Sequence, residues 1–81
     1  MTDVAQLVLL GPAREAAGTK SDTVEGGTLD IVLDAAVERY GDEFKTILAV
    51  SQVWVNGEPA EVNDPVGAND VVTVLPPVSG G

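Results

Sequence analysis

The sequence predicts an α+β fold in which strands and one main helix follow one another in the order ββαβββ. Three observations lead to this prediction. Residues 4–10 and 71–75 are short apolar runs rich in β-prone residues, residues 29–40 repeat their apolar positions with a helical period, and an Asn-Gly pair at 56–57 marks a hairpin turn. A mixed sheet of about five strands packed on one helix would enclose a single core.

The N-terminal part of the chain is expected to form two strands joined by a helical turn. The uninterrupted apolar run at residues 7–10 predicts a strand that is buried on both faces in the middle of a sheet. A Gly-Pro pair ends this strand, and residues 13–17 form a short helical turn closed by Gly18. Residues 22–25 follow as a weaker second strand.

The main helix is predicted for residues 29–40, because its apolar residues recur three and four positions apart, as on a helix that lies against a core. We expect the Thr28 side chain to cap the first turn and Gly41 to end the last turn in the left-handed conformation. A further short turn around Phe44 would close one end of the core. The residues of the apolar stripe are Leu29, Val32, Leu33, Ala36, Val37 and Tyr40.

The C-terminal half is expected to supply three strands. Residues 53–55 lead through a type I′ turn into a return strand at 59–62, which Pro59 would confine to an edge of the sheet because proline has no amide donor. A loop then leads to the last strand, residues 71–75. The first and last strands are the most apolar, so we expect them at the centre of the sheet. The order of elements resembles a ubiquitin-like β-grasp, and by analogy with that fold we expect these two strands to pair in parallel.

The chain therefore divides into a β-grasp domain, residues 1–75, and a flexible, extended C-terminal tail, residues 76–81. Two prolines favour extended backbone at the base of the tail, which could project roughly 20 Å. Glycine has no Cβ, so the last two residues can enter a narrow cleft that any other residue would block. The tail consists of Pro76, Pro77, Val78, Ser79, Gly80 and Gly81.

Composition excludes most kinds of autonomous site. The 81 residues include no Cys and no His, so the chain has no thiol nucleophile, no imidazole base and no metal site of the usual ligands. The formal net charge of −9 disfavours nucleic acid or an anionic membrane as a partner. It serves solubility or steers the chain toward a basic partner protein. No segment is long and apolar enough to span a membrane, and we expect a cytoplasmic location.

The remaining reactive group is the C-terminal carboxylate of Gly81. Its pKa is about 3.3–3.7, so at neutral pH it is an anion and a poor electrophile. A partner enzyme would have to activate it, and adenylation with ATP would supply a good leaving group. The nucleotide site would belong to that partner, because no phosphate-binding glycine loop precedes a helix in this chain.

Three segments make the chain resemble the MoaD/ThiS family of ubiquitin-like sulfur carriers, and most of all the small subunits of molybdopterin synthase. They are residues 11–18 (GPAREAAG), 55–57 (VNG) and 70–81 (DVVTVLPPVSGG), and the last is the most diagnostic. Where the family usually has Gly-Asp before the final strand, this chain has Asn69-Asp70. Asparagine tolerates a positive φ, so we expect the turn to be retained.

The resemblance implies that an E1-like adenylyltransferase activates Gly81 and that the carboxylate becomes a thiocarboxylate. The tail would then enter the large subunit of molybdopterin synthase, in a heterotetramer, and donate its sulfur to the dithiolene of molybdopterin. The chain itself would bind no cofactor and would not be catalytic alone. The resemblance also implies that Arg14 contacts a partner. The alternative interpretation is that Arg14 simply lies on a solvated helical turn.

Two further features have two interpretations each. Trp54 is a candidate partner contact or an ordinary half-buried sheet residue. Asp30, Asp34 and Glu38, four positions apart, form an acidic stripe that marks a partner surface or simply a solvated helix face.

Other functions compatible with the same terminus are sulfur transfer for thiamine thiazole, cysteine or RNA thiolation, and conjugation of Gly81 to lysines as a ubiquitin-like protein modifier. A binding module with an inert tail is the last alternative.

Overall fold

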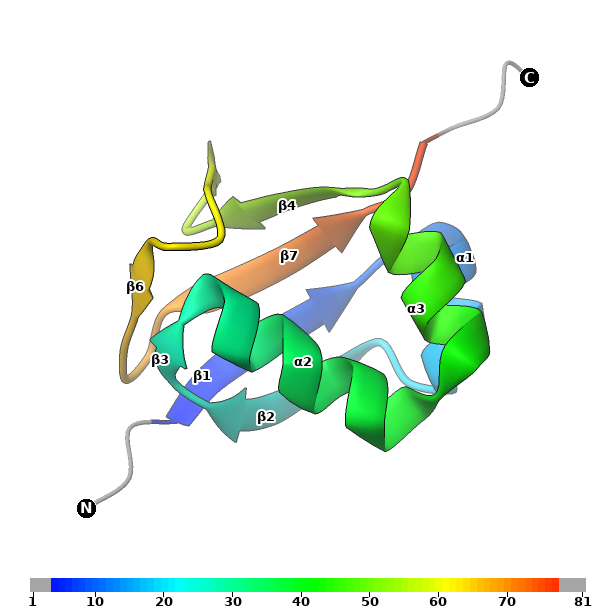
Figure 1. The fold of residues 1–81 in the computed structure, drawn as a ribbon, viewed down its shortest axis with the longest axis horizontal. Helices are drawn as coiled ribbons and strands as arrows, with labels where there is room; N and C mark the ends of the chain where they lie inside the picture. Colours follow the sequence, from blue (N-terminus) through cyan, green and yellow to red (C-terminus); the bar gives the residue numbers. More distant parts are fainter. Residues whose placement is uncertain (1–3, 78–81) are drawn as a thin grey trace.

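The first and last strands lie side by side at the centre of the sheet, with helices packed across it (Figure 1). The computed structural model describes residues 4–77. The five-stranded sheet has the order β2-β1-β7-β4-β5, and β3 and β6 form a separate two-stranded sheet. The elements in chain order are β1 (Val4–Leu9), α1 (Gly11–Ala17), β2 (Ser21–Glu25), β3 (Gly27–Thr28), α2 (Leu29–Tyr40), α3 (Asp42–Ala49), β4 (Gln52–Val55), β5 (Glu58–Pro59), β6 (Pro65–Val66) and β7 (Val71–Leu75).

The expected central pair is confirmed, because β1 and β7 run in parallel with Leu9 opposite Val74. The expectation that β1 is buried on both faces is wrong. Leu7 and Leu9 are fully buried, but Val8 between them is only partly buried and Leu10 is 37% exposed. Successive side chains of a strand point to opposite faces, and the helices cover only one face of this sheet. The other face of the sheet is therefore left open.

Three helices cover the sheet where one main helix was expected. The predicted turn at 13–17 is the end of α1, which starts at Gly11 because Pro12 suits the first turn of a helix. Gly18 ends it in the left-handed conformation, as expected (φ 76°). The expected turn around Phe44 is a helix of eight residues, α3. Phe44 is fully buried and contacts the Tyr40 ring edge-on at 5.2 Å between ring centroids.

The predicted bounds of α2 are confirmed, and the helix is flanked by Thr28 and Gly41 as expected, but the expected side-chain cap and the expected left-handed conformation are wrong. The Thr28 hydroxyl donates to the Asp30 carboxylate and does not cap the helix. Instead, the amides of Leu29 and Asp30 donate to the carbonyls of Asp64 (2.9 Å) and Val62 (3.0 Å). Gly41 has a positive φ of 96° but an extended ψ of −169°, which turns the chain directly into α3.

The hairpin after β4 has the expected turn and a shorter return strand. Asn56 and Gly57 both have positive φ, 53° and 84°, as a type I′ turn requires. Pro59 does lie in the edge strand, yet β5 contains only two residues, because the following segment leaves the sheet to meet the start of α2. Asn69 adopts the positive φ expected of it, 69°.

Candidate functional site

The tail begins where the buried central strand ends. Val72 and Val74 of β7 are fully buried, and β7 is paired with β1 on one side and β4 on the other. Pro76 is half-buried and Pro77 is exposed. A strand that is paired on both sides thus fixes the direction in which the tail leaves. The other four tail residues of the predicted site lie outside the described residues: Val78, Ser79, Gly80 and Gly81.

A hydrogen-bond network fixes the start of β7. The Asn56 amide donates to the Val71 carbonyl at 2.8 Å, and the Val71 amide donates back to Asn56 Oδ1 at 2.9 Å. The carboxylate of Asp70 accepts from the Gly67 amide (2.8 Å) and from Asn56 Nδ2 (3.0 Å). These donors, the Gly67 amide first, hold the pKa of Asp70 below its ordinary value. The hairpin turn and the turn before β7 therefore form one unit.

Exposed apolar residues flank the end of β7. Because Leu9 lies opposite Val74, Leu10 follows beside the strand end, where it is 37% exposed. On the other side Gln52 lies opposite Leu75, so Val50, which is 67% exposed, precedes the neighbouring strand. Sequence reasoning missed both residues, since only the register of the sheet places them beside the tail.

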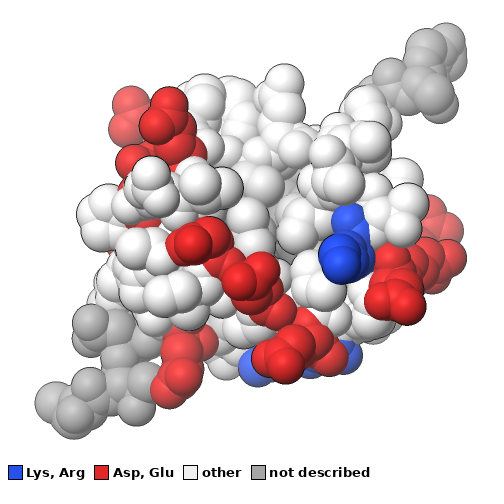
Figure 2. Space-filling view, in the orientation of Figure 1, with Lys and Arg blue, Asp and Glu red and all other residues white. Residues whose placement is uncertain are grey.

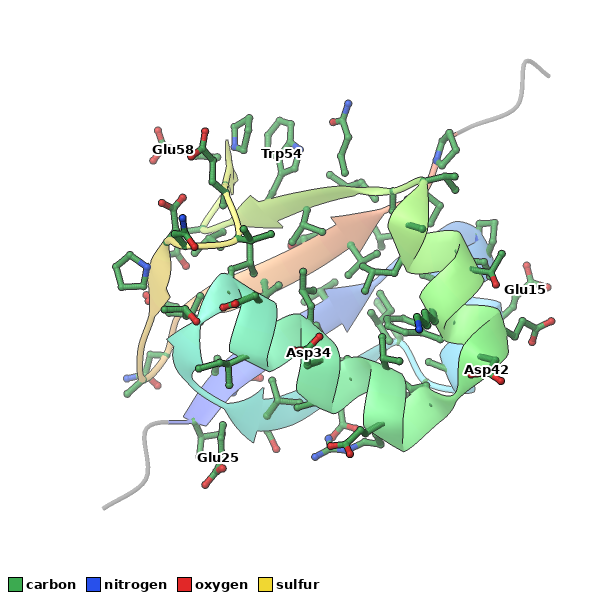
Figure 3. All side chains as sticks on the ribbon, in the orientation of Figure 1. Glu15, Glu25, Asp34, Asp42, Trp54 and Glu58 are labelled. Atoms are coloured by element: carbon green, nitrogen blue, oxygen red, sulfur yellow. The ribbon has the colours of Figure 1, made fainter. Side chains whose placement is uncertain are left out.

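Trp54 lies on the open face of the sheet. Its neighbours Val53 and Val55 pack on the core, so its own side chain points the other way, away from α2 (Figure 3). The indole is only partly buried, and its Nε1 donates to Gln52 Oε1 at 3.3 Å. In the register of the sheet, one row of facing residues crosses this face: Val8, Thr73, Trp54 and Pro59.

The predicted contact Arg14 lies in a different place from Trp54. It is an exposed residue of α1, which packs against α3 and the end of β7. Within residues 4–77 the ion pair formed is Arg39 with Asp22, so Arg14 has no ionic partner there. The structure places Arg14 at the end of the molecule where the tail begins and Trp54 on the open face of the sheet.

Metal-binding groups and membrane-spanning helices are both absent from residues 4–77. Between residues 4 and 77, no group of three or more His, Cys, Asp or Glu could hold a metal ion. No helix in the same range is long and apolar enough to cross a membrane.

These features define a ubiquitin-like β-grasp protein. A mixed sheet packs against the long helix α2, and the chain continues from the central strand β7 into Pro76 and Pro77. The chain belongs to the ThiS family, which matches residues 7–81. It is thus a member of the ThiS/MoaD group of ubiquitin-like sulfur carriers and modifiers, and the predicted family and fold class are confirmed.

Solved structures of the same fold include archaeal and bacterial proteins. SAMP1 from Haloferax volcanii has a TM-score of 0.86 and 26% identity, over 96% of this chain and 99% of that chain. The small archaeal modifier protein 1 from Methanosarcina acetivorans has a TM-score of 0.87 and 22% identity, over 100% and 99%. A chain in the complex of subunits 1 and 2 of the molybdopterin-converting factor from Helicobacter pylori has a TM-score of 0.71 and 24% identity, over 96% and 99%. No curated protein matches the chain.

Proposed function

We propose that this chain is a sulfur carrier for the synthesis of molybdopterin and that its Gly81 carries the sulfur as a thiocarboxylate. The observation that supports this most is the ThiS family match, which extends through residue 81 and so includes the tail. Pro76 and Pro77 continue directly from the buried strand β7, which suits a tail that must be aimed into a partner.

The chemistry begins with the anionic carboxylate of Gly81. A carboxylate oxygen attacks the α-phosphorus of ATP, pyrophosphate leaves, and the acyl carbon becomes bonded to AMP. A sulfide-level sulfur then attacks that carbon, AMP leaves, and a thiocarboxylate results. Since the chain has no His or Cys, a separate E1-like adenylyltransferase supplies the nucleotide site and the proton transfers.

The second partner in this proposal is the large subunit of molybdopterin synthase, with which the chain forms a heterotetramer in the cytoplasm. The tail enters that subunit and delivers sulfur to the forming dithiolene. Val78 and Ser79 anchor the tail, and Gly80 and Gly81 enter the narrowest part of the cleft. Arg14 contacts a partner beside the base of the tail, and Trp54 contacts a partner across the open face of the sheet.

Reconstitution tests the pathway. The charged carrier is mixed with the synthase large subunit and the cyclic pyranopterin precursor, and the formation of molybdopterin is measured. Stoichiometric formation is expected, with loss of the sulfur from the carrier. A charged carrier that yields no molybdopterin belongs to another route, such as thiazole, cysteine or RNA thiolation.

A second candidate function is protein modification, which is favoured by the 26% identity to SAMP1 from Haloferax volcanii. In this case the activated Gly81 acyl carbon is attacked by a lysine amine of a target protein, and AMP leaves as the isopeptide bond forms. Conjugates of higher mass that disappear when Gly81 is deleted would establish this function. Their absence, together with formation of molybdopterin, would leave the carrier function alone.

A further inference from the structure

An apolar groove lies between α2 and the β4–β5 hairpin, apart from the tail. It has a volume of about 320 Å³ and is open to solvent. This volume is at the small end of the range for ligand sites, roughly 300–1,000 Å³. An open groove of this size suits the side chains of a protein segment better than an enclosed cofactor. Its apolar lining includes Leu29, Leu33, Val53, Ala60 and Val62. Trp54 and Pro59 also border it at the edge of the sheet, although their side chains belong to the row on the open face.

Both walls of the groove are fixed in place. One wall is the start of α2, and the other is formed by the strand β4 and the segment after β5. The Leu29 and Asp30 amides donate to the Asp64 and Val62 carbonyls, so they tie the two walls together. The Ala60 amide also donates to the Val53 carbonyl at 3.2 Å. The groove is therefore present before any partner binds, and little ordering would oppose binding.

Val62 lines the groove but is not packed against the hydrophobic core, so core packing does not explain why this residue is apolar. Its side chain is 55% exposed, although it is a valine in a segment that holds the start of α2 through its backbone. A polar residue could make the same backbone contact. An exposed valine at the lip of an apolar groove fits a surface that becomes covered.

The surroundings of the groove are acidic. Asp30 and Asp34 each follow a groove-lining leucine by one position on α2, and Glu58 and Glu61 lie on the hairpin side; all four are exposed. The four acids form two groups, Asp30 with Asp34 on α2 and Glu58 with Glu61 on the hairpin side, and Figure 2 shows acidic side chains in separate groups with uncharged surface between them. In Figure 3, Asp34 projects from α2 and Glu58 from the end of β5. None of the four basic residues of the chain lines the groove: Arg14, Lys20 and Lys45 lie on other segments, and Arg39, near the end of α2, pairs with Asp22.

We propose that this groove docks a segment of a partner protein that presents aliphatic side chains flanked by lysine or arginine. The aliphatic side chains fill the groove, and the flanking cations meet the two acidic groups. Pro59 has no amide to offer at the edge of the sheet, so the segment is held through its side chains and not by adding a strand. This docking site does not depend on whether the tail transfers sulfur or forms conjugates.

The test is a nuclear magnetic resonance titration of the ¹⁵N-labelled full chain with a synthetic, end-blocked peptide in which leucines alternate with lysines. Two matched peptides replace either the lysines with glutamates or the leucines with serines. The lysine–leucine peptide should cause saturable shifts in the amides of Leu33, Val53 and Ala60, and neither control peptide should. Shifts spread over the whole chain, or equal binding of the glutamate peptide, would overturn the proposal.

Two variants of Val62 and one control variant of Ile31 separate binding in the groove from non-specific binding. Val62→Asp should weaken binding by about tenfold or more, because a buried aliphatic contact is replaced by a charge. Val62→Thr keeps the shape and guards against misfolding of the first variant; it should weaken binding by a smaller factor. Ile31→Thr alters a similarly exposed residue (53% against 55%) that does not line the groove, and binding should be unchanged.

The charge requirement is tested with a double variant. Glu58→Lys with Glu61→Lys should weaken binding of the lysine–leucine peptide severalfold and remove most of its salt dependence. Asp42→Lys with Glu43→Lys makes the same change of charge on α3, outside the groove, and should have a much smaller effect. Equal effects of the two double variants would show that net charge alone attracts the peptide and would overturn the proposed site.

Discussion

Asn56 and Asp70 are fourteen positions apart in the chain, and a 3.0 Å hydrogen bond from Asn56 Nδ2 to Asp70 Oδ1 joins them. Asn56 belongs to the hairpin turn after β4, whereas Asp70 immediately precedes β7. Their contact holds the beginning of the strand whose other end becomes the tail. The direction of the tail is thus set partly by residues at the far end of β7.

Asn56→Ala should destabilise the chain by roughly 1–2 kcal/mol, because it leaves the Val71 amide without its acceptor and removes a donor from Asp70. It also places alanine at a positive φ. The free energy of unfolding in urea measures the effect. Asn63→Ala changes an exposed loop asparagine and serves as the control. Equal stability of the two variants would contradict the role of the network.

Acid should weaken the contact between β2 and α2. The Tyr40 hydroxyl (2.6 Å), the Thr23 amide and Arg39 (2.8 Å) all donate to the carboxylate of Asp22 and hold its pKa below the ordinary value of 3.8. A carboxyl group whose pKa is lower in the folded chain than in the unfolded chain stabilises the fold at pH values above its unfolded pKa. This stabilisation is lost as the pH falls through its folded pKa. Stability of the chain should therefore fall below about pH 4, and Asp22→Asn should flatten this fall.

Alkali should also weaken the contact between β2 and α2, because it ionises the Tyr40 hydroxyl that donates to Asp22. Burial, followed by the hydrogen bond to Asp22, raises the pKa of Tyr40 to about 12. A hydroxyl whose pKa is higher in the folded chain than in the unfolded chain stabilises the fold at pH values below its unfolded pKa. This stabilisation is lost as the pH rises through its folded pKa, here between about pH 10 and 12. Tyr40 is the only tyrosine, so absorbance of the phenolate reports its titration alone. Ionisation near pH 10 in the folded chain would contradict this contact.

Tyr40→Phe should remove that alkaline transition and cost about 0.5–1.5 kcal/mol at neutral pH, the usual contribution of one hydrogen bond. Its ring should keep the edge-on contact with Phe44. Unfolding in urea at pH 7 and pH 11 separates the two effects. A loss that is the same at both values would show that packing, and not the hydroxyl, is responsible.

Trp54→Ala should weaken binding of the activating enzyme or the synthase large subunit by about tenfold or more, since a partly exposed aromatic side chain would be lost from a docked face. Ile31→Ala removes another exposed apolar side chain that is 53% exposed and should have little effect. Because Trp54 is the only tryptophan, its fluorescence in the wild-type chain should also change on binding. Unchanged affinity and fluorescence would place the interface elsewhere.

The sequence predicted the fold correctly where a local pattern of residues favours one secondary structure. The apolar period of α2, the Asn-Gly turn and the apolar β7 all appear where they were expected. The errors arose where tertiary contacts decide the outcome. Thr28 fails to cap α2 because the carbonyls of Val62 and Asp64, more than thirty positions later, already accept the first amides of the helix.

The candidate site divides in the same way. Composition and motif indicated the tail, and Pro76 and Pro77 do follow the central strand. The sequence could not place Leu10 and Val50 beside the end of β7, nor the groove beside α2, because these surfaces exist only once strands are paired in register. Asn56 was recognised for its turn, and its side-chain contact with Asp70 could not be read from local sequence.

Gly81→Ala should sharply reduce sulfur transfer while the fold remains intact, because a methyl group on the last residue would meet the narrowest part of the partner's cleft. Single-turnover transfer to the partner and the unfolding midpoint should be measured together. Adding one residue after Gly81 should have the same effect. Full transfer by either variant would contradict the assigned role of the terminus.

The most direct test of sulfur transfer is the intact mass of the purified chain after incubation with its activating enzyme, ATP and a sulfur donor. We expect that one oxygen is replaced by one sulfur and that fragmentation places the change on Gly81. The replacement should require ATP and should not occur when Gly80 and Gly81 are deleted. A terminal carboxylate that never exchanges oxygen for sulfur under these conditions would contradict the central claim.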